Sequence, residues 1–373
     1  MAPETPNLEQ VFNDDLLMGE NDPQFAQEQF PKISHVLDDL SLKKEFKKYD
    51  VAANEARERV RLFGFTTIGA SAVALVALTT QPVWPHAACT RWIAAVIELT
   101  GSLAAIVAIG GLWLGSWKQR WLKNRLMTER LRQWHFQLMV RRGREIEASC
   151  KGHDAVVAFQ KEREKWFAYF LKNHQGKLDG QLESAVNDPV ETMAWLHDRS
   201  TSYDIGSPTL ADIFDAYQLL RFDHQYKYTM YKLESTTDKP FWKFLKWPPA
   251  VQRAALSGAS GSCFVNALIC SVFLVWAHLF GADEQVELYL RTTAIVIALL
   301  GVGLRAVQEG LGIEREIDRY QEYRERISLL RDRFKNTSDE KERLHIMEEF
   351  EVVSVQEMQD FMRTHQKAKF VLA

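Results

Sequence analysis

The side chains that could support catalysis in this chain are few and do not cluster. Two His-Asp dipeptides occur, His153-Asp154 and His197-Asp198, but no further His or Asp stands at a spacing that would complete a metal site or a catalytic triad around them. The motifs GxxxxGKS/T, GxGxxG, HExxH and GxSxG do not occur in the sequence. The 4 Cys include no CxxC pair, which argues against a zinc ribbon and a disulfide scaffold. We therefore expect no enzymatic activity, no metal and no cofactor.

Two ionisable residues, Glu98 and His278, lie within long apolar stretches. Counted from Trp92 at ~1.5 Å per residue, Glu98 would lie about 9 Å below the outer boundary of a membrane-spanning helix. A carboxylate at that depth is costly and usually faces a partner or water. One interpretation is that Glu98, with His278 at a similar depth, lines a pore or responds to protons. The alternative is an interfacial Glu98 accommodated by local water or by Arg91.

A third group of polar residues falls on successive turns of one expected helix: Arg221, Gln225, Tyr228 and Tyr231. An Arg paired with Tyr hydroxyls is a suitable site for a phosphate-bearing signal or for a protein partner. The alternative is a structural seam that docks beneath the membrane.

The elements that must position these residues include four stretches with almost no charge. A spanning helix needs about 20 apolar residues, and Leu62 to Trp84, Trp92 to Trp117, Ala254 to Ala282 and Leu288 to Leu304 are suitable. For the last and shortest stretch, a buried core helix is the alternative. The rest of the chain is rich in charged residues, so the overall content of 46% hydrophobic residues combines apolar segments with strongly charged ones. The net charge of the whole chain is −3. The net charge gives no basic field, and we expect no direct binding of nucleic acid.

The basic residues lie on one side of these stretches, as the positive-inside rule requires of cytoplasmic segments. The short connections, around Pro82 to Arg91 and Gly281 to Leu290, carry a single base, Arg91. The prediction is an all-α membrane protein with two transmembrane hairpins, long cytoplasmic helical extensions and both termini in the cytoplasm. Its parts are an acidic N-terminal arm with a basic juxtamembrane helix (1–61), the first hairpin (62–117), a cytoplasmic helical module (118–253), the second hairpin (254–307) and C-terminal cytoplasmic helices (308–373).

Helical signals continue outside the apolar stretches. Trp117 to Glu147 has no Gly or Pro before Gly143, which predicts a long helix continuing the second span. Ser207-Pro208 is typical of a helix N-terminus, and that helix should run to about Glu234. An apolar stripe suited to packing against another helix or another subunit follows the fourth span: Ile313, Ile317, Tyr320, Tyr323, Ile327, Leu330 and Phe334. Strand signals are nearly missing.

The first 39 residues hold nine Asp and Glu but a single base, Lys32. No apolar region follows a basic start, so we expect no signal peptide. The arm is predicted to be either a solvated terminus or a partner-binding or inhibitory tail that faces the basic juxtamembrane helix. Near the third span, Pro240 to Pro248 alternates aromatic residues with Lys, as an interfacial anchor would.

Small residues at helical spacing mark faces for close helix packing. Gly111 and Gly115 form a GxxxG pair, while Gly101 and Gly258 each have a small residue four positions later. The same chemistry serves packing within one chain and between subunits, so both alternatives stay open.

Three segments resemble a known family, the SLATT domains (SMODS- and SLOG-associating two-transmembrane effector domains). Tyr217 to Lys232 is similar to the lead-in helix, with Arg221, Gln225 four later and aromatic residues beyond it. Lys47 to Ala56 is similar to the lead-in of another subtype, and Arg125 to Trp134 to the family's exit helix with its Arg…Glu-x-Leu-Arg…Trp pattern. Thr229 departs from the pattern, since a second aromatic residue is usual there, and so does Leu233, where Ala is common.

The resemblance implies a tandem SLATT protein in the bacterial inner membrane with a role in antiviral defence. On that basis we expect a pore-forming effector, a homo-oligomer that permeabilises the membrane when a partner or a nucleotide signal triggers it. A nucleotide-signal sensor or synthase would then be the partner. The alternatives are a membrane scaffold that recruits a soluble enzyme and a small ion channel. The spans hold few polar groups and no broken helix, which disfavours the channel.

Overall fold

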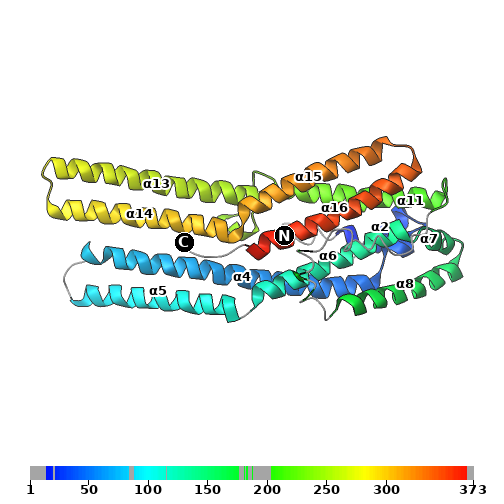
Figure 1. The fold of residues 1–373 in the computed structure, drawn as a ribbon, viewed down its shortest axis with the longest axis horizontal. Coiled ribbons are helices and arrows are strands. Elements are labelled where there is room, and N and C mark those ends of the chain that lie inside the picture. Colours follow the sequence, from blue (N-terminus) through cyan, green and yellow to red (C-terminus); the bar gives the residue numbers. More distant parts are fainter. Residues whose placement is uncertain are drawn as a thin grey trace, which may run out of the picture. The chain divides into compact units, whose positions relative to one another are not determined.

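The computed structural model describes residues 14–19, 22–83, 88–114, 116–175, 180, 182–183, 187 and 203–367. Over these residues the protein is helical and contains no β-strand (Figure 1). The helices form two compact units. The helical unit comprises Met1–Asn54, Trp121–Leu233 and Asp318–Arg363, and the apolar unit comprises Glu55–Arg120, Glu234–Ile317 and Thr364–Ala373.

The helical unit is built from segments far apart in the sequence around one aromatic core. Phe222 lies at its centre, with its ring centroid 4.5 Å from that of Phe350 and 5.2 Å from that of Phe334. Phe136 and Tyr217 pack edge to face, with centroids 5.9 Å apart. The elements of this unit are α2 (Asp22–Gln29), α3 (Ser34–Leu37), the first part of α4 (Leu40–Thr80), most of α6 (Trp117–Arg141), α7 (Gly143–Ser149), α8 (His153–His174), α11 (Pro208–Tyr217), the π-helical turn η4 (Gln218–Asp223), α12 (His224–Lys232) and most of α15 (Ile313–Asn336) and α16 (Glu340–Lys367).

The N-terminal segment belongs to this core, so the expectation of a solvated arm is wrong for its described residues. The acids of the segment alternate with apolar side chains that are at most 4% exposed: Leu16, Leu17, Ala26, Phe30, Ile33, Val36 and Leu37. Asp39 contributes to the start of α4, because its carboxylate accepts a hydrogen bond from the Leu42 N–H at 3.0 Å. The high average charge of the segment concealed the apolar side that packs inward. Residues 1–13 and 20–21 lie outside the described residues.

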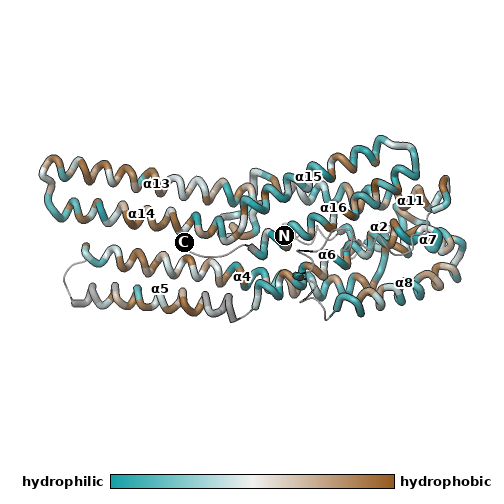
Figure 2. Tube along the Cα trace, in the orientation of Figure 1, coloured by the Kyte–Doolittle hydropathy of each residue, from teal (hydrophilic) through white to brown (hydrophobic). Residues whose placement is uncertain are grey.

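The apolar unit contains the long apolar helices (Figure 2). Its elements are the second part of α4, the 3-10 turn η2 (Gln81–Val83), α5 (Ala88–Leu114), the 3-10 helix η5 (Phe241–Lys246), α13 (Pro249–Leu279) and α14 (Glu284–Leu311). Three segments are long and apolar enough to cross a membrane, namely Ser34–Val83, Pro249–Leu279 and Glu284–Leu311, and a shorter apolar stretch, Ala95–Ala108, lies in α5.

Helix pairs within the apolar unit approach closely where small residues stand. On α13 and α14, which pack side by side, the Ser260 hydroxyl donates to the Gly301 carbonyl at 3.1 Å. On α5, a Cβ added at Gly101 would lie 3.0 Å from the Ala70 carbonyl oxygen of α4. The predicted small face at Gly101 is therefore a helix contact. Around Gly258 nothing lies within 4 Å of such a Cβ, so its small face is open in the single chain.

Local helix signals gave some boundaries correctly and others wrongly. Ser207 caps α11 as expected, since its hydroxyl accepts from the Leu210 N–H at 3.1 Å. The expected continuous helix from the second span is wrong: α5 ends at Leu114, and α6 begins at Trp117 after Ser116, which has a φ of 44°. A left-handed residue stops the α-helical hydrogen-bond ladder, and Gly115, which directly precedes Ser116 in the sequence, is a local signal for a break at this point.

The burial of the N-terminal segment predicts the effect of a truncation at Ile33, which is 0% exposed. Ile33→Ala removes buried methyl groups, so we expect a loss of about 2–5 kcal/mol in the free energy of unfolding. The measurement is denaturant unfolding of the full chain in detergent micelles. The matched control is Val51→Ala, a 48% exposed position on α4 of the same unit, where the change should stay within about 0.5 kcal/mol. Equal effects of the two variants would show that the segment is solvated after all.

A buried ionic network as the candidate functional site

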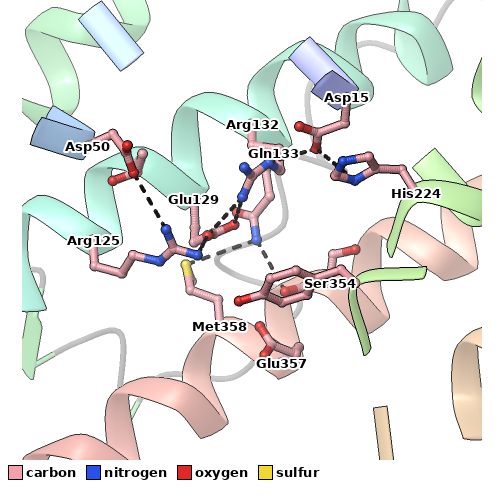
Figure 3. Close-up of polar contacts among 12 residues, drawn as sticks. Asp15, Asp50, Arg125, Glu129, Arg132, Gln133, His224, Ser354, Glu357 and Met358 are labelled. Atoms are coloured by element: carbon pink, nitrogen blue, oxygen red, sulfur yellow. Dashed lines mark hydrogen bonds and ion pairs between the residues drawn. The ribbon is translucent and has the colours of Figure 1, made fainter. Parts of the chain in front are cut away.

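Three charged residues recur on one side of α6 and form the centre of the site (Figure 3). Arg125 and Arg132 lie one turn before and one turn after Glu129. The Arg125 Nη2 is 2.6 Å from Glu129 Oε1, and the Arg132 Nη1 donates to both oxygens of Glu129 at 2.9 Å. The spacing of four and three residues places all three on one helix face. Two guanidinium groups therefore share a single carboxylate on this helix.

The remaining negative charge comes from other parts of the chain. Asp15, which is 0% exposed, lies 2.8 Å from the Arg132 Nε. Asp50 of α4 lies 3.8 Å from Arg125 Nη1, and the His224 Nδ1 of α12 lies 4.0 Å from Asp15 Oδ2, the oxygen that also faces Arg132. The network thus joins the N-terminal segment, α4, α6 and α12 within the helical unit.

Helix α16 also takes part in this site. The side-chain amide of Gln133 donates to the Ser354 carbonyl at 3.3 Å and lies 4.0 Å from the Met358 sulfur. Arg319 of α15 forms an ion pair with Glu357 and lies over the Tyr320 ring at 4.2 Å. Five helices and the N-terminal segment therefore depend on the same group of polar contacts.

The charges of the network hold one another in the ionised state. Burial alone would raise the pKa of Glu129, but the positive charges of Arg125 and Arg132 outweigh this effect and lower the pKa to about 2. Burial alone would lower the pKa of Arg132, but Asp15 and Glu129 raise it. Neither group can be neutralised near neutral pH, so a change in the network requires that a partner carboxylate move away.

A second buried ion pair, between Arg221 and Glu351, lies in the core of the helical unit. Arg221 is 2% exposed and forms a bidentate pair with Glu351 of α16, at 3.0 Å from Nε to Oε1 and 3.1 Å from Nη2 to Oε2. The Tyr217 hydroxyl donates to the same Oε1 at 2.7 Å. The Arg221 guanidinium also lies 4.5 Å from the centroid of the Phe136 ring. Burial alone would lower the pKa of Arg221, but the Glu351 charge raises it.

The four residues considered for a phosphate-bearing signal have separate surroundings. Arg221 lies in the π-helical turn η4, whose wider turns change the phase of the helix before α12 begins at His224. Its guanidinium is engaged inside the unit, which favours the seam over the phosphate site. The Tyr228 hydroxyl lies 3.2 Å from that of Tyr320, and Gln225 and Tyr231 are half-buried.

Glu98 and His278 do not come together in the described part of the apolar unit. The Gln81 side chain donates to Glu98 at 2.9 Å, near the end of α4. His278 is 77% exposed and lies 3.2 Å from Glu287 on α14. The alternative partner of Glu98, the Arg91 side chain, lies outside the described residues, as do the surroundings of Gly111 and all of Gly115.

The arrangement joins helices from distant parts of the chain through buried ion pairs. No group of three or more His, Cys, Asp or Glu that could hold a metal ion occurs among the described residues. His153 is exposed at the start of α8, and His197-Asp198 lies outside the described residues. No family model, no curated protein and no solved structure matches this chain.

Sequence reasoning missed the acidic side of the site. Asp15 and Glu351 stand in segments with many other acids, and no local pattern distinguishes them. The basic side carried a signal, because Arg125, Glu129 and Arg132 are spaced for one helix face. An amphipathic helix has such a charged face whether or not the charges are buried, and here the partners come from distant segments.

The Arg221–Glu351 pair predicts a large difference between single and double replacement. Arg221→Met leaves the Glu351 charge buried without its partner, and we expect a loss of about 3–5 kcal/mol in unfolding free energy. The double variant Arg221→Met/Glu351→Met should recover most of this loss, because Tyr217 keeps the Met347 carbonyl as acceptor at 3.2 Å. Denaturant unfolding in detergent measures both. A double variant that loses as much as the sum of the single variants would contradict the pairing.

Two histidines predict an acid sensitivity of the helical unit. Burial, and to a smaller extent the positive charge of Arg163, lower the pKa of His35 from 6.5 to about 4. The same two causes lower the pKa of His135 from 6.5 to about 3. Below pH 6.5 the unfolded chain therefore binds more protons at these two histidines than the folded chain does. Their contribution to the free energy of unfolding is fully present above pH 6.5 and is lost as the pH falls towards 4 and then 3.

The melting temperature in detergent should therefore drop between pH 7 and pH 5, before carboxylates titrate. His135→Phe should reduce this drop, whereas His345→Phe, at an exposed position on α16, should not. An identical pH profile for both variants would contradict the assignment.

Proposed function

We propose that this chain is a membrane effector of a bacterial antiviral defence system, built as a tandem SLATT protein. It oligomerises and permeabilises the inner membrane when a partner or a nucleotide signal triggers it. The resemblance of Lys47–Ala56, Arg125–Trp134 and Tyr217–Lys232 to SLATT lead-in and exit helices supports the family. The membrane role is supported by a difference in surface: the apolar unit exposes large apolar side chains, and the helical unit buries them.

The observation that carries the proposal is the exposed apolar surface of the apolar unit. On α13, Val265, Leu268, Val272 and Trp276 are 57–65% exposed, although each is a large apolar side chain. Such a continuous surface is unstable in water and suited to lipid. In the helical unit, by contrast, the large aromatic residues of the core are buried.

Four transmembrane helices are proposed, formed by the apolar part of α4 and by α5, α13 and α14. The basic residues near their ends then assign both termini to the cytoplasm. Helix α4 carries Asp50 of the ionic network and continues without interruption into its apolar part. A trigger that separates Asp50 from Arg125 would therefore act directly on a proposed spanning helix.

The apolar stripe of α15 is not free to drive this step. Its members Ile313, Ile317, Tyr320, Tyr323, Ile327, Leu330 and Phe334 are at most 7% exposed within the single chain. Ordering of the stripe against another subunit, as the sequence suggested, would first require the unit to open. The open small face at Gly258 on α13 is a better contact between copies, since small residues permit close helix approach.

The test is membrane potential in cells that express the chain. A potential-sensitive dye should report depolarisation before growth stops. Gly258→Leu should weaken depolarisation because it blocks close approach, whereas Val265→Leu, at a 57% exposed position of the same helix, should leave it unchanged. Growth arrest with an intact potential would contradict the effector and favour a scaffold that recruits a soluble enzyme.

A further inference from the structure

The segment that precedes α13 has a defined structure with its own hydrogen bonds. The Trp247 indole donates to the Lys239 carbonyl at 3.0 Å, and the Gln252 amide donates to the Phe244 carbonyl at 2.8 Å. The Lys239 ammonium donates to the Lys246 carbonyl at 3.1 Å. These bonds hold the backbone of Lys239–Trp247 in a compact loop around η5.

The same loop lies at the polar ends of the apolar helices. Arg61, the last charged residue before the apolar part of α4, donates to the Leu245 carbonyl at 3.1 Å. Arg253, the last charged residue before the apolar part of α13, lies 3.3 Å from Glu314, which follows the end of α14. Within the apolar unit, the loop therefore contacts α4 at the charged boundary of its apolar part and leads directly into α13. In a membrane this level is the interface with water.

Two bases of the segment 239–253 already have partners, since the Lys239 ammonium donates to the Lys246 carbonyl and Arg253 lies 3.3 Å from Glu314. The other two bases of the segment are Lys243 and Lys246. Lys243 and Lys246 are exposed and have no carboxylate partner in the described part of the chain. Exposed lysines elsewhere do pair, for example Lys165 with Glu162 at 2.8 Å. Two unpaired ammonium groups on a rigid loop are a binding site for an anion.

Aromatic side chains beside these lysines select the kind of anion. The rings of Phe244 and Trp247 pack together with centroids 5.3 Å apart. Aromatic residues are enriched at the level of lipid headgroups, where one side of the ring is apolar and the other wet. A ligand that offers both a phosphate and acyl chains would satisfy the lysines and the apolar surface of α13 together. A free phosphate would satisfy the lysines alone.

We propose that Lys243 and Lys246 bind the phosphate headgroup of an anionic phospholipid. The proposal rests on the membrane insertion assumed in the proposed function, and it adds the lipid class and the residues that recognise it. Each lysine near an anionic headgroup is worth ~5-fold in affinity, so both together give about 30-fold. The site fixes the level of the loop at the membrane surface, and with it the charged boundary of the apolar part of α4 and the start of α13.

The experiment uses the full chain reconstituted into phosphatidylcholine vesicles. Pyrene-labelled phosphatidylglycerol is titrated into the bilayer, and energy transfer from tryptophan gives the mole fraction at half saturation. In Lys243→Ala/Lys246→Ala this mole fraction should rise about 30-fold, and Lys243→Arg/Lys246→Arg should restore it. The matched control Lys161→Ala/Lys165→Ala, with the same charge change on α8 of the helical unit, should leave it unchanged.

Two outcomes would overturn the inference. One is unchanged half saturation in Lys243→Ala/Lys246→Ala. The other is full competition by water-soluble glycerol phosphate, which would indicate a site for free anions. Failure of the wild-type chain to incorporate into phosphatidylcholine vesicles, with or without phosphatidylglycerol, is a distinct result. It would overturn the proposed membrane function itself.

Discussion

The burial of charge on α6 is the constraint on which the helical unit depends. Arg132 is 5% exposed, and a buried guanidinium without an anion would cost several kcal/mol. Glu129 alone cannot neutralise both arginines of this helix, so Asp15 and Asp50 must approach. That requirement draws the N-terminal segment and α4 to α6. The same helix, α4, continues into the apolar unit.

How far the sequence predicts the fold depends on whether a signal is local. The apolar helices, the Ser207 cap and the helical class follow from runs and spacings of neighbouring residues, and the structure contains them. The prediction of an apolar face on α15 is also confirmed, since the residues of the stripe are buried. The break at Ser116 has a local signal in the adjacent Gly115, although a continuous helix was expected here. The π-helical turn around Arg221 carries no such signal, because tertiary packing and not local propensity determines it.

The site is predictable only in part for the same reason. The spacing of Arg125, Glu129 and Arg132 indicates one charged face, and Arg221 was singled out as functional. Their acidic partners lie more than a hundred residues away in the case of Asp15 and Glu351, so no periodicity connects them. Composition misled at the N-terminal segment, since many acids suggested solvent exposure while two of them, Asp15 and Asp39, are buried against Arg132 and Arg163.

The apolar unit exposes large apolar side chains, whereas the helical unit buries them. The central proposal follows from this difference: the apolar helices cross the lipid bilayer, and the charged helices remain inside the cell. Cysteine accessibility tests it most directly. In a chain whose native cysteines are replaced, Lys165→Cys reports the helical unit and Gln285→Cys reports the connection between α13 and α14. An impermeant maleimide should label Gln285→Cys in intact cells and Lys165→Cys only after lysis. Equal labelling of both positions in intact cells would contradict the account.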